Sequence, residues 1–184
     1  MNGVRLVLAE DASESDLDAF GQAWGWVPLP SSRPTAQDVT TREWTSSRSP
    51  ASIRYVDDPI LGLRFLEVSG DGTEDVALWV AMLFPVKDRE ELDRMVRSVG
   101  DPESWSSLMS LAAIQGSLDF DPERFLILGN GLAHFDARVR LATLHGVAYL
   151  DWPAFDTPLQ RITESDPDRE VRAAAANLLA DRHA

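Results

Sequence analysis

The sequence is notable first for what it lacks, beginning with cysteine. Without cysteine it offers no disulfide framework, no thiolate nucleophile and no cysteine-based zinc site. Lysine is almost missing too, since only Lys87 among the 17 basic residues is not arginine. Long apolar runs are also lacking, and the short apolar stretch near the start gives way to acidic residues, which predicts neither a signal peptide nor a membrane anchor. We therefore expect a cytoplasmic protein that does not bind membranes.

Basic residues are also few: the chain has 30 acidic residues and 17 basic ones, which gives a formal net charge of −13. Both halves of the chain are negative, and no local stretch concentrates basic residues. Such a field repels phosphate backbones, so nucleic acid is not expected as a direct ligand. It favours a protein partner with a basic surface, although acidity also serves solubility.

The sequence also lacks the residue patterns that are typical of enzyme active sites. The histidines at positions 134, 145 and 183 have no acidic residue at the helical spacing of a metal site, and neither His-Glu-x-x-His nor Gly-x-Ser-x-Gly occurs. Gly129-Asn130-Gly131 lies inside a helical pattern and follows no strand, so it does not predict a phosphate-binding loop. The sequence therefore predicts no enzyme, no metal site and no cofactor.

The first part of the chain, residues 1–85, predicts a small α/β sandwich with the order β-α-β-β-β-α. Alternating apolar residues predict strands, and a cap at Ser13 or Ser15 starts the first helix. The helix capped by Thr73 is apolar almost all round, so we expect it to be buried. We expect both helices on one face of a single sheet. The expected strands are Gly3–Glu10, Thr40–Ser47, Ser52–Asp57 and Gly62–Ser69.

Two local features refine this domain. Asp57, Asp58 and Pro59 form a turn signature, so the flanking strands make a hairpin with Tyr55 near Leu63 or Phe65. The same pattern favours local hydrogen bonding over a metal or acid–base role for the two aspartates. The tryptophans near position 25 are expected to close a small core, with a docking surface as the alternative.

After Pro85, which ends the preceding helical pattern, residues 86–184 predict helices and short turns. Asp-Pro-Glu at 101–103 and again at 121–123 combines a cap, a first-turn proline and an acid. The first of these helices is expected to run to Gln115. Six helices then form about three pairs, an α-α superhelical stack in an α+β chain.

A repeat supports the pairing. In Asp168–Leu179 a capping aspartate precedes an apolar face at i, i+3, i+4, i+7 and i+8, and Asp136–Val147 repeats that frame 32 residues earlier. Arg140 stands where Arg172 does. A degenerate copy begins 35 residues before that, at Asp101.

The stretch DPDREVRAAAANLLAD resembles the HEAT repeat of short bacterial type, and DARVRLATLHGVAYL is a weaker match. The resemblance implies an armadillo-like α-solenoid in which Asp136, Arg140, Asp168 and Arg172 stabilise the stack. It also implies protein binding, as an interaction scaffold or adaptor. One alternative is an immunity or antitoxin-like protein that neutralises a basic toxin. Another is a HEAT-fold DNA-base glycosylase, which the acidity disfavours.

If the stack forms, its second helices line an inner surface of small, mostly uncharged residues that suits a partner helix or strand. The alternative is that the α/β domain covers this strip. The candidate binding residues are Ser106, Ser110, Leu141, His145, Ala148, Ala173 and Asn177.

Overall fold

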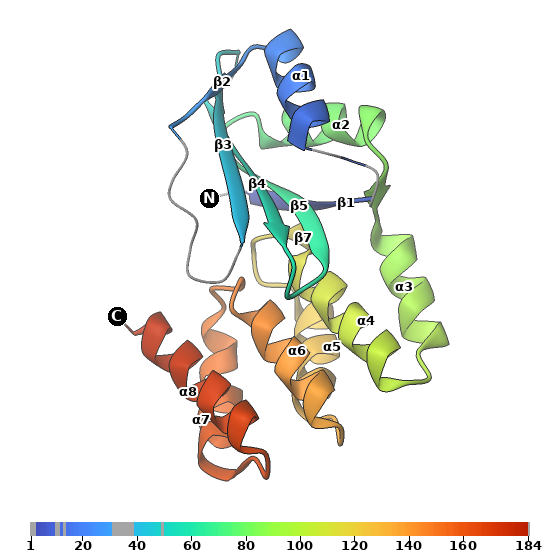
Figure 1. Ribbon diagram of the computed structural model, residues 1–184, viewed down its shortest axis with the longest axis vertical. Coiled ribbons are helices and arrows are strands. Elements are labelled where there is room, and N and C mark those ends of the chain that lie inside the picture. The colour runs from blue at the N-terminus through green and yellow to red at the C-terminus, as the bar shows by residue number, and fades with distance from the viewer. Residues whose placement is uncertain (1–2, 10–11, 13, 31–38, 49, 184) are drawn as a thin grey trace. The chain divides into compact units, whose positions relative to one another are not determined.

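The computed structural model describes residues 3–9, 12, 14–30, 39–48 and 50–183 of the chain (Figure 1). These residues form an antiparallel sheet of seven strands and eight α-helices, which confirms the mixed class predicted from the sequence. Two compact units emerge: Met1–Glu91 with Ile114–Asp119, and Leu92–Ala113 with Phe120–Ala184. The boundary expected after residue 85 thus falls after Glu91 here, and a short later segment returns to the first unit.

The sheet of the first unit has the strand order β2-β3-β4-β5-β1-β6, with β7 paired to β1 as well. Every pairing is antiparallel. The strands are β1 (Gly3–Leu8), β2 (Trp26–Pro28), β3 (Thr40–Ser46), β4 (Ala51–Asp58), β5 (Leu63–Gly70), β6 (Val86–Lys87) and β7 (Gly116–Ser117).

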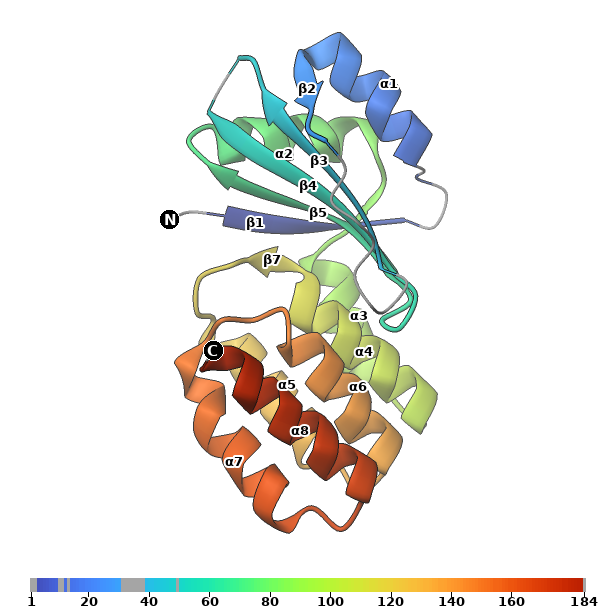
Figure 2. The ribbon, with the colours of Figure 1, turned by 60° about the vertical axis from the view of Figure 1, so that its left-hand side comes forward.

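The two helices of this unit, α1 (Glu14–Trp24) and α2 (Thr73–Leu83), lie on the same side of the sheet, as Figure 2 shows. Leu17 of α1 and Val80 of α2 share one buried cluster with Ile53 and Trp44 of the sheet. Alternate strand residues face the helices because side chains of a strand point to opposite faces. The prediction of one sheet with two helices on one face is therefore confirmed.

The predicted hairpin is present as β4 and β5, but its register differs from the expected one. Tyr55 lies opposite Leu66 rather than beside Leu63 or Phe65. The turn is as predicted, because the Asp58 carboxylate accepts hydrogen bonds from the N–H groups of Ile60 and Leu61 at 2.8 and 3.1 Å. Asp58 thus acts as a local turn residue.

Three short strands were not predicted. Between α1 and β2, Gly25 with φ 78° reverses the chain, and Pro28 within β2 is tolerated because β2 is an edge strand. The strands β6 and β7 have two residues each, and each pairs with part of β1. The helix expected to include Gln115 ends at Ile114, so the prediction that everything after Lys87 is helix or turn was wrong there.

Helix α2 also corrects two expectations. Its cap is Gly72 in the left-handed conformation, while the Thr73 hydroxyl donates to the Gly70 carbonyl at 2.6 Å. It is not buried all round, since Met82 is 73% exposed. Only the narrow face with Val80 meets the sheet, because one helix can cover a sheet with one side only. Of the two serines expected to cap the first helix, Ser15 lies inside α1 and is not its cap, and Ser13 lies outside the described residues.

The second unit is helical throughout its described part. Helix α5 packs on α6, α7 packs on α8, and α6 packs on α8 (Figure 2). A 3₁₀ turn, η1 (Pro153–Phe155), precedes α7. The helices are α3 (Arg89–Ser98), which begins in the first unit, then α4 (Pro102–Ile114), α5 (Pro122–Leu132), α6 (Ala137–Val147), α7 (Asp156–Ser165) and α8 (Arg169–Arg182).

The predicted capping aspartates all accept hydrogen bonds from the first turn of their helices. Asp101, Asp121, Asp136 and Asp168 bind backbone N–H groups two or three residues further on, at 2.8–3.2 Å. These bonds satisfy donors that a helix start leaves free, which is why the local sequence located the starts of α4, α5, α6 and α8. Within the described residues no helix is long and apolar enough to cross a bilayer.

Candidate binding site in the helical unit

The strip of residues expected to bind a partner does not form one exposed surface. Ser110 of α4 is only 4% exposed. Ser106, Leu141 and His145 are half-buried, whereas Ala148, Ala173 and Asn177 are exposed. Ala148, which caps the end of α6, and Ala173 and Asn177 of α8 are therefore exposed as expected, whereas the parts of the strip on α4 and within α6 are buried or half-buried.

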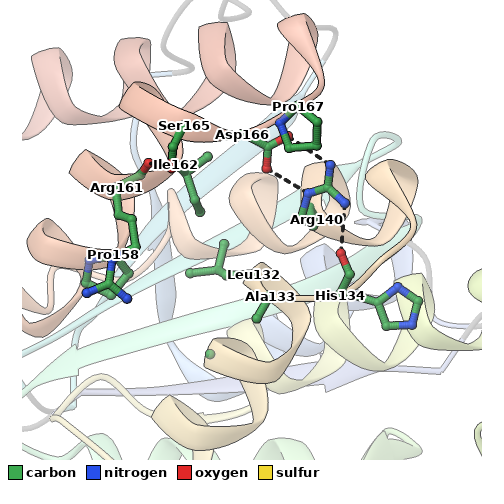
Figure 3. A pocket seen from close by; sticks show the side chains of 11 residues that line it. Leu132, Ala133, His134, Arg140, Pro158, Arg161, Ile162, Ser165, Asp166 and Pro167 are labelled. Atoms are coloured by element: carbon green, nitrogen blue, oxygen red, sulfur yellow. Dashed lines mark hydrogen bonds and ion pairs between the residues drawn. The ribbon is translucent and has the colours of Figure 1, made fainter.

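A pocket of about 420 Å³ lies elsewhere in the same unit, near the turns that connect the helices. Leu132 of α5 and Ile162 of α7 supply its apolar floor, and Figure 3 shows both side chains between the two helices. The remaining lining residues are Gly129, Ala133, His134, Arg140, Pro158, Arg161, Ser165, Asp166 and Pro167. Such a lining suits an apolar side chain.

An ion pair forms one wall of the pocket. Nε and Nη2 of Arg140 donate to the two carboxylate oxygens of Asp166, each at 2.8 Å, and Nη1 donates to the carbonyl of His134 (Figure 3). Nη1 also donates to the carbonyl of Phe135. The two side chains are 8% and 5% exposed. Because nearly all donors of Arg140 are engaged, this arginine holds the turns together and has little capacity left for a ligand.

The carboxylate of Asp166 stays charged in this setting. Burial raises its pKa, but hydrogen bonds from Arg140 and from the N–H of Asp168, with the charges of Arg140 and Arg172, outweigh burial and hold the pKa below its ordinary value. Asp166 therefore does not serve as a proton donor near neutral pH.

His134 contributes its backbone to the pocket, while its imidazole ring points away from the floor (Figure 3). Nδ1 of the ring accepts a hydrogen bond from the N–H of Asp136 at 3.1 Å, and the ring centroid lies 5.2 Å from that of Trp105. This histidine is thus occupied by its neighbours and does not aim a base at the pocket.

Arg161 is the cation at the rim of the pocket. Its side chain is exposed, and among the residues that the structure describes none accepts a hydrogen bond from its guanidinium. An exposed, unoccupied guanidinium next to an apolar floor can recognise an anionic group beside an apolar one. The pocket thus combines shape, apolar surface and one available charge.

The other deeply buried arginine of this unit has a structural role. Arg124 is 3% exposed, and it donates from Nε and Nη2 to the carbonyls of Ala112 and Ala113 at 2.8 Å. It also lies over the Trp152 ring at 5.2 Å. Carbonyls at the end of α4 attract a cation through the helix dipole, so Arg124 caps that helix.

No family model, no curated protein and no solved structure matches this chain.

Function must therefore be inferred from the residues themselves. Throughout the described ranges no group of three or more histidine, aspartate or glutamate side chains is placed to hold a metal ion. The pocket residues Leu132, Arg161 and Ile162 were not among the predicted site residues. They belong to first helices of the pairs, and a helical apolar pattern cannot separate a pocket floor from ordinary core.

The first unit carries a different exposed feature on α2. Leu78, Met82 and Leu83 are 58%, 73% and 58% exposed, and Glu74 and Asp75 of the same helix are exposed too. Single exposed apolar residues are ordinary, whereas three within six positions make a patch. We call this set of five residues the α2 patch.

A second cavity of about 490 Å³ lies beside the β4–β5 turn. Asp57, which lines it, pairs with Arg64 at 3.1 Å, and Asp58 holds the turn described above. The pair of aspartates is thus engaged in local structure, as the turn signature predicted, and this cavity offers no clear site.

Proposed function

We propose that this protein is a protein-binding module and that its second unit is a short HEAT-like array. Two sets of contacts repeat at 32 residues and support the array. Arg140 donates to the carbonyls of His134 and Phe135, and Arg172 donates to those of Asp166 and Pro167. Equal contacts at equal spacing are typical of helix pairs related by translation.

The pocket at the helix turns is the observation on which the binding proposal rests. The pocket opens to solvent above the largely buried side chains of Leu132 and Ile162, and Arg161 stands at its rim with no hydrogen-bond acceptor among the described residues. A partner segment with a leucine- or phenylalanine-like side chain beside a carboxylate fits both features. Interfaces commonly concentrate their energy in one such buried anchor.

The test is a substitution designed to fill the pocket. A Cβ atom at Gly129, which lines the pocket, meets nothing within 4 Å, so Gly129→Trp places an indole ring in the cavity. Asn130→Trp is the matched control, because Asn130 is the next residue of α5, is exposed and does not line the pocket.

Both variants and the unaltered protein are used to capture partners from cells of the source organism, followed by quantitative mass spectrometry. We expect one partner to be retained by the unaltered protein and by Asn130→Trp and to be lost with Gly129→Trp. Retention of every partner by Gly129→Trp would show that the pocket is not the binding site.

The alternative is an immunity-like protein that covers a basic toxin, and the α2 patch favours it. Apolar side chains next to Glu74 and Asp75 suit a partner surface that mixes apolar and basic residues. In that case Met82→Glu abolishes capture of a basic protein and Gly129→Trp does not, so the same experiment distinguishes the two proposals.

A further inference from the structure

Helices α4, α6 and α8 share one frame. Each begins after a capping aspartate, namely Asp101, Asp136 and Asp168. Four residues after the cap stand Trp105, Arg140 and Arg172 respectively. This position is therefore occupied in all three helices by a large side chain with hydrogen-bond donors.

In the first two helices this side chain touches the turn of the next helix pair. The ring of Trp105 lies 5.2 Å from that of His134, and Arg140 binds Asp166 through two hydrogen bonds of 2.8 Å. His134 and Asp166 are equivalent, because each lies two residues before a cap. Each also accepts a hydrogen bond from the N–H of that cap, at 3.1 and 2.9 Å.

Arg172 reproduces only half of this arrangement. Its Nη1 donates to the carbonyls of Asp166 and Pro167 at 2.5 and 3.2 Å, as Nη1 of Arg140 does to its own turn. On Arg140 the other edge of the guanidinium, Nε and Nη2, holds the carboxylate of the next turn. No described residue accepts a hydrogen bond from that edge of Arg172.

The helix surface below the arginine shows the same difference. On α6, Arg140, Leu144 and Val147 are 6%, 2% and 0% exposed, and α8 packs against this helix. The equivalent line on α8 consists of Arg172, Ala176 and Leu179, which are only half-buried. It follows the spacing i, i+4, i+7 of one helix face.

The charge of this face of α8 indicates what kind of partner can bind it. The same face continues to the exposed His183, and Arg169 lies one turn before Arg172. Glu170 and Asp181 lie on the opposite side of the helix at 100° per residue. Among the described residues of α8 this face therefore carries Arg169, Arg172 and His183, and the one carboxylate near them, that of the cap Asp168, accepts hydrogen bonds from the first turn of its own helix. In a chain of net charge −13 such a face favours an occupant that brings a carboxylate.

We propose that this face of α8 docks a helix hairpin of a partner protein whose connecting turn carries an aspartate two residues before the cap of its second helix. That carboxylate occupies Nε and Nη2 of Arg172, as Asp166 occupies Arg140. This inference rests on the proposed protein-binding function and names the chemistry of a partner at a surface separate from the pocket.

The test uses the full chain with a copy of residues 152–183 attached directly after His183, which preserves the 32-residue spacing. The copy presents to α8 the same hairpin that α6 already binds. We expect its backbone amides to be protected from hydrogen exchange. We also expect Arg172→Gln to lower the Tm of the extended chain by several degrees while changing the original chain little.

Arg169→Gln is the control, because it removes an exposed charge on the same turn without removing the lateral contact, and it should affect both chains equally. Replacing the copy's equivalent of Asp166 with asparagine should reproduce the Arg172→Gln effect, and combining both changes should add nothing. An unprotected copy, or an equal effect of Arg172→Gln in both chains, would overturn the proposal. Neither result bears on the pocket, which Gly129→Trp tests separately.

Discussion

Two glycines of α5, two residues apart, should respond in opposite directions to replacement by alanine. A Cβ atom at Gly131 would come within 2.5 Å of Oγ1 of Thr143 and 2.9 Å of Cγ of Met109, and it would also meet the sulfur of Met109. Thr143 cannot yield freely, because its hydroxyl donates to the Val139 carbonyl at 2.7 Å. At Gly129 the same Cβ atom meets nothing within 4 Å.

The magnitudes follow from two opposing contributions. Alanine in place of glycine within a helix stabilises by about 0.5–1 kcal/mol. Forcing an extra methyl group into a packed core costs about 1–3 kcal/mol, and Met109 and Thr143 are both fully buried. Gly131→Ala should therefore lower the free energy of unfolding by about 1–2 kcal/mol. Gly129→Ala has only the favourable contribution and should raise it by up to about 1 kcal/mol.

Urea unfolding followed by circular dichroism measures both changes as shifts of the midpoint at constant slope. In thermal unfolding, each kcal/mol corresponds to about 2–4 °C in Tm for a chain of this size. If Gly131→Ala were as stable as Gly129→Ala, the close approach of α5 to α4 and α6 at this point would be refuted.

Three further predictions concern charge and exposure. Arg140→Met leaves the buried carboxylate of Asp166 unpaired and should lower the free energy of unfolding by about 3–5 kcal/mol. Arg172→Met should lower it by no more than about 1 kcal/mol. Equal losses in urea unfolding would contradict the different burial of the two arginines. Hydrogen bonds from Arg138 hold the pKa of Asp136 at about 2, below the value of about 3.9 in an unfolded chain, so the stability that this carboxylate contributes is complete above about pH 4 and lost as the pH falls toward 2. Carbon-detected NMR titration should locate that pKa, and Asp136→Asn should flatten the pH dependence of Tm in this range. Met82→Glu, at an exposed position, should change the unfolding free energy by less than about 0.5 kcal/mol, and a larger loss would mean that α2 is covered in the folded protein.

Local chemistry explains which elements could be predicted. A capping aspartate acts on N–H groups only two or three residues away, so Asp101 and Asp168 marked their helices without any knowledge of the rest of the chain. The same holds for the turn at Asp58. The short strand β7 could not be found in this way, because two residues carry no periodicity and Gly116 and Ser117 become a strand only by pairing with β1.

At the candidate site, too, local features could be predicted from the sequence and tertiary contacts could not. The repeat at 32 residues identified Arg140 and Arg172 as equivalent, but it gave no sign that one is buried against Asp166 while the other is half-exposed. It also placed Ser110 on the inner surface expected to bind a partner, whereas the structure shows Ser110 only 4% exposed. Exposure depends on what packs against a helix, and that is not a local property of its sequence.

The sequence by itself therefore determined the starts of α4, α5, α6 and α8, the turn between β4 and β5, the 32-residue spacing and the acidic charge, because these depend on neighbours along the chain. Only the tertiary structure decided which arginine keeps a free edge, where the pocket opens and which side of α2 stays in solvent. Each of those outcomes depends on residues far apart in sequence, as in the pair Arg140 and Asp166, which lie 26 positions apart. Their contact exists only once the helices have packed.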